Sequence, residues 1–178
     1  MKKLRLLVTE KCDRACPGCC NKDWDLGSLP VCSDFSRYDV VMLTGGEPML
    51  DPWRLLRIIG EVREQNPDCP IYVYTARTKN PAALEYVLAF ADGLCLTLHD
   101  QSDYEPWLSF ARRISTVRDK SLRLNVFDGV RAPGLDTFRN QWKIKTGMKW
   151  IKNCPLPDDE VFMRYCKSAI RELQIRKD

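Results

Sequence analysis

Short apolar segments alternate with amphipathic segments along the chain, and this pattern predicts a parallel α/β sheet. Five apolar runs have the length of buried strands: Leu4–Thr9, Val40–Thr44, Ile71–Thr75, Leu94–His99 and Leu122–Phe127. Such continuous apolar runs are typical of parallel strands, which are covered on both faces. Because helical patterns separate the runs, we expect crossover connections between successive strands.

Proline and capping residues mark the helices between these strands. Asp51-Pro52 is an N-cap followed by proline in the first turn, so a helix should begin there and end before Pro67. Asn80-Pro81 begins a second helix, to about Phe90, by the same logic. A third helix is expected over residues 103–117.

The C-terminal part has weaker patterns. Lys149–Ile151 is predicted to form a sixth, ragged strand, and Asp158–Ile175 a helix, although the apolar residues of that segment do not fall into one stripe. We expect one domain over residues 1–178. Its core should span about residues 1–130, with a C-terminal extension over about residues 131–178.

The fourth and fifth strands alternate between apolar and polar side chains. One face carries Leu94, Leu96, Leu98, Leu122, Leu124 and Val126, and the other carries Cys95, Thr97, His99, Ser121, Arg123 and Asn125. Successive side chains of a strand point to opposite faces, so the apolar set should pack against the helices. The polar set should then line an interior near the carboxyl ends of the strands, where such folds bind ligands.

Composition agrees with a cytoplasmic protein. The chain has 178 residues and a formal charge of +4, which does not indicate nucleic-acid binding. Met1-Lys2-Lys3 leads into an apolar run too short for a signal peptide, and we expect no membrane span. Nine cysteines, an odd number, cannot all form disulfides. The basic residues Arg171, Arg176 and Lys177 form either a solvated helix face or a patch for an acidic electron-donor protein.

Three cysteines, Cys12-x3-Cys16-x2-Cys19, lie in a polar loop directly after the first strand. Three thiolates can bind three irons of a cubane cluster, which leaves the fourth iron open to a small molecule. The spacing differs from that of bacterial ferredoxins and from the two separated pairs of a zinc ribbon. A structural zinc site or reduced core thiols are the alternatives for the trio taken alone.

A second motif, Gly45-Gly46-Glu47-Pro48, follows the second strand. Two glycines allow the backbone to approach a ligand closely, although without the cysteines the motif would read as a simple turn. In this order, the two motifs resemble the radical S-adenosylmethionine (SAM) superfamily. The resemblance covers the layout from Leu4 to about Phe127 and is specific at the two motifs.

This resemblance implies a fold, two cofactors and their ligands. The fold would be a partial open barrel of about five or six βα units. A [4Fe-4S] cluster would be held by Cys12, Cys16 and Cys19, and the amine and carboxylate of SAM would chelate the open iron. Gly45-Gly46-Glu47 would contact the methionyl amine. Gly18, where the family often has an aromatic residue that touches adenine, would offer only its backbone.

One small group within the superfamily is particularly similar. The stretch from Cys16 to Asp25, with Asn21 and Trp24, looks like the cluster loop of anaerobic ribonucleotide reductase activating enzymes, and so does Ile71–Thr75 at the third strand. Those enzymes tend to carry an acidic residue on the fourth strand, whereas this chain has Thr97-Leu98-His99. The 7-carboxy-7-deazaguanine synthase group often has Ser-x-Lys there.

Four strand residues are further candidates for the site. Thr97 suits a ribose hydroxyl or the carboxylate of SAM. His99 could replace the lysine of the Ser-x-Lys pattern as a hydrogen-bond donor, although a lone histidine at a strand end is more often structural. Asn125 would contact the ribose or carboxylate of SAM. Arg123 would hold an anionic group of the substrate, or would be paired with an acid inside the protein.

The remaining cysteines are expected to have lesser roles. Cys69 and Cys95 should be ordinary buried thiols, and Cys20 a bystander beside the third ligand. An auxiliary cluster could instead be formed by Cys154 and Cys166 together with Cys20 or Cys32, but these residues lack ligand-like spacing.

The resemblance implies that SAM is reductively cleaved to a 5′-deoxyadenosyl radical, which abstracts hydrogen from a substrate. We expect a low-potential electron donor of the flavodoxin or ferredoxin type and a reducing, anaerobic cytoplasm. Activation of a glycyl-radical enzyme is the leading prediction, because a short chain would leave the barrel open to a protein loop. A small-molecule enzyme of the 7-carboxy-7-deazaguanine synthase type, or a non-catalytic iron–sulfur or zinc protein, are the alternatives.

Overall fold

A single parallel sheet forms the centre of the protein. The computed structural model describes residues 1–151 and 155–166, and within them the sheet has eight strands. They are β1 (Lys3–Thr9), β2 (Val31–Cys32), β3 (Val40–Gly45), β4 (Ile71–Thr75), β5 (Gly93–Leu98), β6 (Ser121–Phe127), β7 (Trp142–Met148) and β8 (Glu160–Tyr165). The order is β2-β8-β1-β3-β4-β5-β6-β7, and every neighbouring pair is parallel. The predicted α/β class with parallel strands is confirmed.

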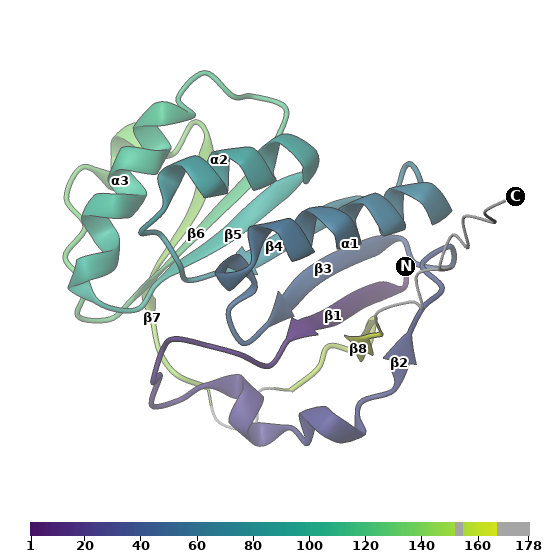
Figure 1. Cartoon of the computed structure of the whole chain (residues 1–178). Coiled ribbons are helices and arrows are strands. Elements are labelled where there is room, and N and C mark those ends of the chain that lie inside the picture. Colours follow the sequence, from purple (N-terminus) through teal and green to yellow (C-terminus); the bar gives the residue numbers. More distant parts are fainter. Residues whose placement is uncertain (152–154, 167–178) are drawn as a thin grey trace, which may run out of the picture.

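Among the described residues, three α-helices cover one face of this sheet. They are α1 (Pro52–Gln65), α2 (Pro81–Phe90) and α3 (Tyr104–Arg113). The long connection between β1 and β2 runs on the other side of the sheet (Figure 1). It contains the 3-10 turns η1 (Cys20–Asp23) and η2 (Leu26–Ser28), while η3 (Pro48–Leu50), η4 (Gln101–Asp103) and η5 (Leu135–Phe138) lie elsewhere. No helix among the described residues is long and apolar enough to cross a membrane.

The predicted helix starts are confirmed by their caps. The Asp51 carboxylate accepts a hydrogen bond from the Arg54 amide at 2.9 Å, and the Asn80 side chain accepts one from the Ala83 amide at 3.1 Å. Each bond satisfies an amide that has no partner within its helix. The third helix is shorter than predicted, because α3 ends at Arg113.

The core lies between the sheet and its helices, as the alternation in β5 and β6 predicted. The apolar set of these strands is at most 3% exposed and consists of Leu94, Leu96, Leu98, Leu122, Leu124 and Val126. It packs in one cluster with Leu55 and Ile58 of α1, Leu84 of α2, and Trp107 of α3. The opposite face of the strands is therefore free to line a site.

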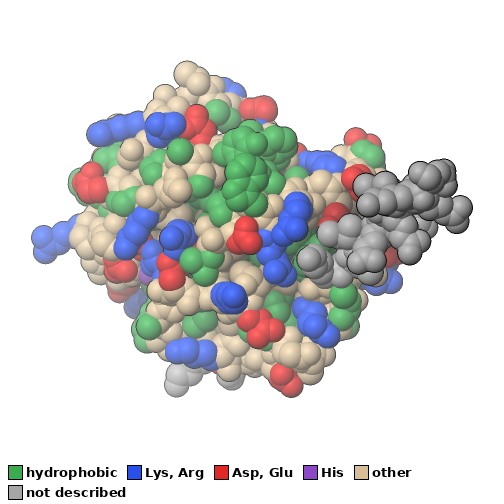
Figure 2. Space-filling model, viewed as in Figure 1, with side chains coloured by type: hydrophobic (Ala, Val, Ile, Leu, Met, Phe, Trp, Pro, Cys, Tyr) green, Lys and Arg blue, Asp and Glu red, His purple; other side chains and the backbone are tan. Residues whose placement is uncertain are grey.

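The helical layer also carries an exposed aromatic patch. Trp53 of α1 and Tyr86 and Phe90 of α2 are 69%, 48% and 52% exposed. Their rings contact one another, with centroids 5.8 and 5.5 Å apart. Figure 2 shows apolar side chains gathered over these helices.

The sixth strand was predicted in the wrong place. Lys149–Ile151 is not a strand. The strand that pairs with β6 is β7, which begins at Trp142, seven residues before Lys149. Trp142 is 1% exposed, and its ring centroid lies 5.7 Å from that of Trp107. The buried indole fixes which segment joins the sheet, because it fills the space beside α3.

The predicted C-terminal helix is also wrong where the structure describes it. Residues 160–165 form β8, which pairs with β1 on one side and with β2 on the other. Val161, Phe162 and Tyr165 are β-branched or aromatic residues that fit a strand better than a helix. The rest of the predicted helix, residues 167–175, lies outside the described residues.

Candidate functional site

The two sequence motifs meet at one pocket beyond the carboxyl ends of the strands. We call residues 10–25 the cysteine loop and Gly45-Gly46-Glu47 the glycine loop. A pocket of about 250 Å³ lies between them. Most of the predicted site residues line it, namely Cys12, Cys16, Cys19, Gly45, Gly46, Glu47, Thr97 and His99. Residues that are far apart in the sequence are therefore brought together.

Backbone hydrogen bonds fasten the glycine loop to the beginning of the cysteine loop. The Gly46 amide donates to the Thr9 carbonyl at 2.7 Å, and the Glu47 amide donates to the Lys11 carbonyl at 2.8 Å. On the far side of the cysteines, the Asn21 side chain donates to the Gly45 carbonyl at 2.6 Å. Both ends of the cysteine segment are thus held against the same three residues.

These contacts explain why the loop has two glycines. Gly45 has a φ of +139°, and a Cβ there would lie 2.3 Å from the Thr9 carbonyl oxygen. A Cβ on Gly46 would lie 2.2 Å from the Lys11 carbonyl oxygen. Because the obstructing atoms belong to the backbone, a side chain at either position would push the cysteine loop away.

Glu47 is a buried carboxylate that joins two strand ends. It is 2% exposed and accepts hydrogen bonds from the Met49 amide at 2.9 Å, the Thr75 hydroxyl at 2.5 Å and the Ala76 amide at 3.0 Å. Burial raises the pKa of Glu47, and these bonds partly oppose that shift. Glu47 therefore fixes the glycine loop to the end of β4. Its contact with the amine of SAM stays a prediction.

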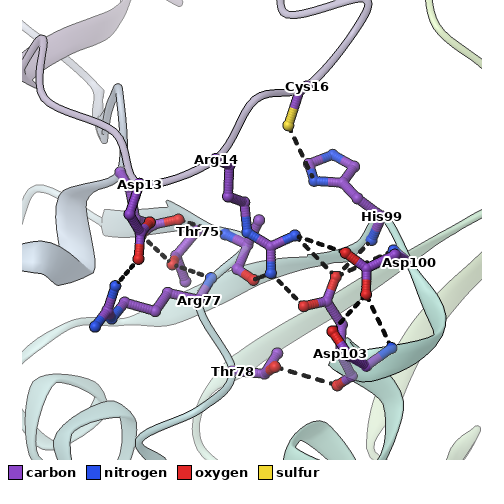
Figure 3. Close-up of polar contacts among 12 residues, drawn as sticks. Asp13, Arg14, Cys16, Thr75, Arg77, Thr78, His99, Asp100 and Asp103 are labelled. Atoms are coloured by element: carbon purple, nitrogen blue, oxygen red, sulfur yellow. Dashed lines mark hydrogen bonds and ion pairs between the residues drawn. The ribbon is translucent and has the colours of Figure 1, made fainter.

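An ion pair with a buried carboxylate connects the cysteine loop to η4, which follows β5. Arg14 lies between the first two cysteines, and its guanidinium binds both oxygens of Asp103, which is fully buried (Figure 3). The Nη1–Oδ2 distance is 2.9 Å, and Nη2 also donates to the Ala76 carbonyl at 2.8 Å. Burial lowers the pKa of Arg14, but the hydrogen bond and charge of Asp103 outweigh it, so the net pKa is raised. Sequence reasoning missed this pair because neither residue belongs to a motif.

The same carboxylate holds His99 beside the middle cysteine. Oδ2 of Asp103 accepts hydrogen bonds from the amides of His99 at 2.9 Å and Asp100 at 3.2 Å. His99 follows β5 directly, and its Nδ1 lies 3.8 Å from Sγ of Cys16. Burial, and secondarily the charge of Arg14, lowers the pKa of His99.

Trp150 is a second residue that sequence reasoning missed. Its ring stacks on His99, with centroids 4.9 Å apart and planes inclined by 28°, and its centroid lies 4.3 Å from that of Phe127. A Cβ on Gly18 would lie 2.5 Å from Cβ of Trp150. Gly18 is therefore needed for packing of the cysteine loop against Trp150, whereas its predicted contact with adenine stays untested.

A second pocket of about 360 Å³ adjoins the first on the face of the sheet away from the helices. Both pockets are lined by Cys20, Asn21, Thr44 and Tyr74, and the second also by Arg5, Trp24, Met42, Asn125 and Phe162. Asn125 thus faces this interior, where it donates to Sγ of Cys95 at 3.4 Å. Arg123 lines neither pocket; it is exposed, and its guanidinium lies 5.6 Å from the Tyr72 ring centroid.

The three predicted ligands are all thiols that line one pocket, and their binding of a cluster stays a prediction. Burial raises the pKa of the Cys16 thiol, and the charge of Cys19 raises it further. Burial also raises the pKa of the Cys12 thiol, and the charge of Cys19 contributes in the same direction. Among the described residues, no three His, Cys, Asp or Glu side chains are spaced to hold one metal ion. Cysteines of a cubane each bind a different iron, so the group needs no single-ion geometry.

The other described cysteines are buried in the core or lie at the surface, except Cys20. Cys32, Cys69 and Cys95 are 2%, 3% and 6% exposed, and burial raises the pKa of Cys95 to about 11. Cys20 lies beside the trio and lines both pockets, and Cys166 is exposed. Cys154 lies outside the described residues.

Comparison of the sequence with protein-family models and with curated proteins finds no match. The geometry of the pockets and the residues around them therefore carries the interpretation of this chain.

Substitution of Gly46 tests whether the two loops are packed as tightly as described. We expect Gly46→Ala to lower the free energy of unfolding by about 1–3 kcal/mol, because its Cβ would collide with backbone. Gly60→Ala is the matched control, since Gly60 lies within α1 with nothing within 4 Å of a Cβ. It should raise stability by about 0.5–1 kcal/mol in the same urea titration. Equal effects of the two substitutions would contradict the packing.

The buried ion pair gives a second stability prediction. Arg14→Ala leaves the Asp103 carboxylate buried without its cation, which should cost about 3–5 kcal/mol of unfolding free energy. Arg139→Ala removes an ion pair to Asp136 whose side chains are 53% and 90% exposed, so its cost should stay below about 1 kcal/mol. Thermal and urea unfolding measure both. A small cost at Arg14 would show that the pair does not anchor the loop.

Proposed function

We propose that this chain is a radical SAM enzyme, which cleaves SAM reductively and uses the resulting radical for hydrogen abstraction. One observation carries the proposal. The three cysteines and the glycine loop are separated in the sequence, yet they line one pocket at the carboxyl ends of parallel strands. This is the arrangement that a cluster with an open iron and a ligand bound at that iron would need.

We propose further that the strands form an open partial barrel whose interior contains both pockets. The helices lie on one face of the sheet (Figure 1). Arg5, Met42 and Tyr74 line the second pocket, and they alternate along their strands with core residues packed under those helices. The pocket residues therefore point to the opposite face, as the interior of a barrel requires.

The residues of the site divide into ligands and supports. Cys12, Cys16 and Cys19 would hold the [4Fe-4S] cluster, which when bound supplies the electron that breaks the C5′–S bond of SAM. The glycine loop exposes backbone to the pocket, and Thr97 adds a hydroxyl that can bind ribose or carboxylate. Glu47, Asn21 and the ion pair at Arg14 hold these elements in place. A flavodoxin- or ferredoxin-type donor and a reducing cytoplasm belong to the same proposal.

Formation of 5′-deoxyadenosine tests this proposal. The protein is reconstituted anaerobically with iron and sulfide, then reduced in the presence of SAM and analysed by chromatography. We expect product from the native chain and none from Cys16→Ala. Cys69→Ala, at a buried cysteine outside the pocket, should retain both cluster and product. A reconstituted native protein that never cleaves SAM would be a non-catalytic iron–sulfur or zinc protein.

The second pocket favours a small-molecule substrate over a glycyl-radical enzyme. Its volume of about 360 Å³ lies within the usual range for small ligands. The prediction of a protein substrate assumed an open side, but β8 and β2 extend the sheet beyond β1. Trp24 of the cysteine loop packs edge-on against Phe162 of β8, with centroids 5.3 Å apart, and narrows that side further. We therefore place a small-molecule enzyme, of which the 7-carboxy-7-deazaguanine synthase type is one example, ahead of the activation of a glycyl-radical enzyme.

Transfer of deuterium distinguishes these substrates, because the abstracted atom ends in 5′-deoxyadenosine. The native host is grown on deuterated medium, and its extract is divided by size filtration. Each fraction is then incubated with active, unlabelled enzyme and SAM. If the substrate is a small molecule, mass spectrometry should find 5′-deoxyadenosine with a single deuterium only with the filtrate, because SAM carried over from the deuterated host would give a multiply deuterated product instead. Deuterium from the protein fraction alone would support activation of a glycyl-radical enzyme instead.

A further inference from the structure

The single histidine of the chain lies where it can bond to the middle cysteine of the trio. Nδ1 of His99 and Sγ of Cys16 are 3.8 Å apart, and Figure 3 shows the imidazole directed at the sulfur. A cysteine that binds metal has lost its proton, so its sulfur can only accept a hydrogen bond. In the cluster-bound protein, Nδ1 would therefore have to be the protonated ring nitrogen.

One buried carboxylate fixes both partners of this contact. Oδ2 of Asp103 accepts from the His99 amide at 2.9 Å and from Nη1 of Arg14 at 2.9 Å. Arg14 lies two residues before Cys16 in the cysteine loop. Because Asp103 is fully buried and binds both segments, it sets the separation between the imidazole and the sulfur.

The ring of His99 is held as well as its backbone. It stacks on Trp150 and meets Phe127 edge-on, with centroids 4.9 and 4.7 Å away. These contacts restrict rotation of the imidazole, so Nδ1 stays directed at the cysteine loop. They also exclude water from one side of the contact, which strengthens a hydrogen bond.

We propose that His99 donates a hydrogen bond from Nδ1 to the Cys16 thiolate and thereby raises the reduction potential of the cluster, with Asp103 as the residue that positions it. The cluster itself rests on the proposed function. An N–H donor withdraws electron density from the thiolate and favours the reduced cluster, which carries one more negative charge. His99 would then tune the electron-accepting step, instead of or in addition to contacting SAM.

The midpoint potential of the reconstituted cluster tests the proposal. His99→Phe keeps an aromatic ring for the stack but has no donor, and His99→Gln keeps an N–H donor. We expect the equilibrium constant for one-electron reduction of the cluster to be about three- to tenfold lower in His99→Phe than in the native protein. A tenfold decrease corresponds to a midpoint potential about 59 mV lower. The midpoint potential of His99→Gln should lie between those of the native and Phe proteins. Equal potentials in the native and Phe proteins, both with full iron content, would overturn the role of His99.

A measurement on the native chain covers the case in which His99→Phe does not take up a cluster. Since the chain has one histidine, ¹⁵N-histidine labels this residue alone. Pulsed electron paramagnetic resonance of the reduced cluster should detect an isotropic coupling to the ¹⁵N nucleus at Nδ1, which a ring that only packs nearby would not give. Absence of coupling overturns the hydrogen bond while leaving the proposed function intact. A native protein that forms no [4Fe-4S] cluster overturns both proposals.

Discussion

The buried ion pair between Arg14 and Asp103 is the constraint on which the site depends. The cysteine loop has little apolar surface of its own, and it must lie across the carboxyl ends of the strands to meet the glycine loop. A carboxylate with no exposed surface is costly unless a cation neutralises it, so Asp103 holds Arg14 and the loop firmly in place. Because the same carboxylate binds the amide of His99, the loop and the end of β5 share one anchor.

The two pockets follow from this arrangement. With the cysteine loop fixed over the strand ends, its second half runs across the face of the sheet opposite α1, α2 and α3, where Trp24 meets Phe162. The cysteines, the glycine loop and His99 line one space, and aromatic and apolar side chains with Arg5 and Asn125 line the adjoining one. A cofactor that reacts at one end and a substrate at the other would need such adjoining spaces.

Local signals in the sequence predicted much of this fold, whereas contacts between distant segments were not visible. Apolar runs and the Asp51 and Asn80 caps act within a few residues, so five strands and the starts of two helices could be found. The position of β7 depends on Trp142 packing against α3, and β8 exists through pairing with β1. In the site, the motifs predicted which cysteines and glycines meet. Asp103 and Trp150 belong to no motif and act through distant partners, so the sequence alone gave no signal for them.

An iron left open by three cysteines is the central claim, and the response of the cluster to SAM tests it most directly. Native protein is reconstituted and reduced, and its electron paramagnetic resonance spectrum is recorded before and after SAM is added. Coordination of SAM at the open iron should change the g values of a [4Fe-4S]⁺ signal, without a change in iron content. A signal that SAM leaves unchanged, or a protein that binds zinc and no cluster, would contradict the proposed site.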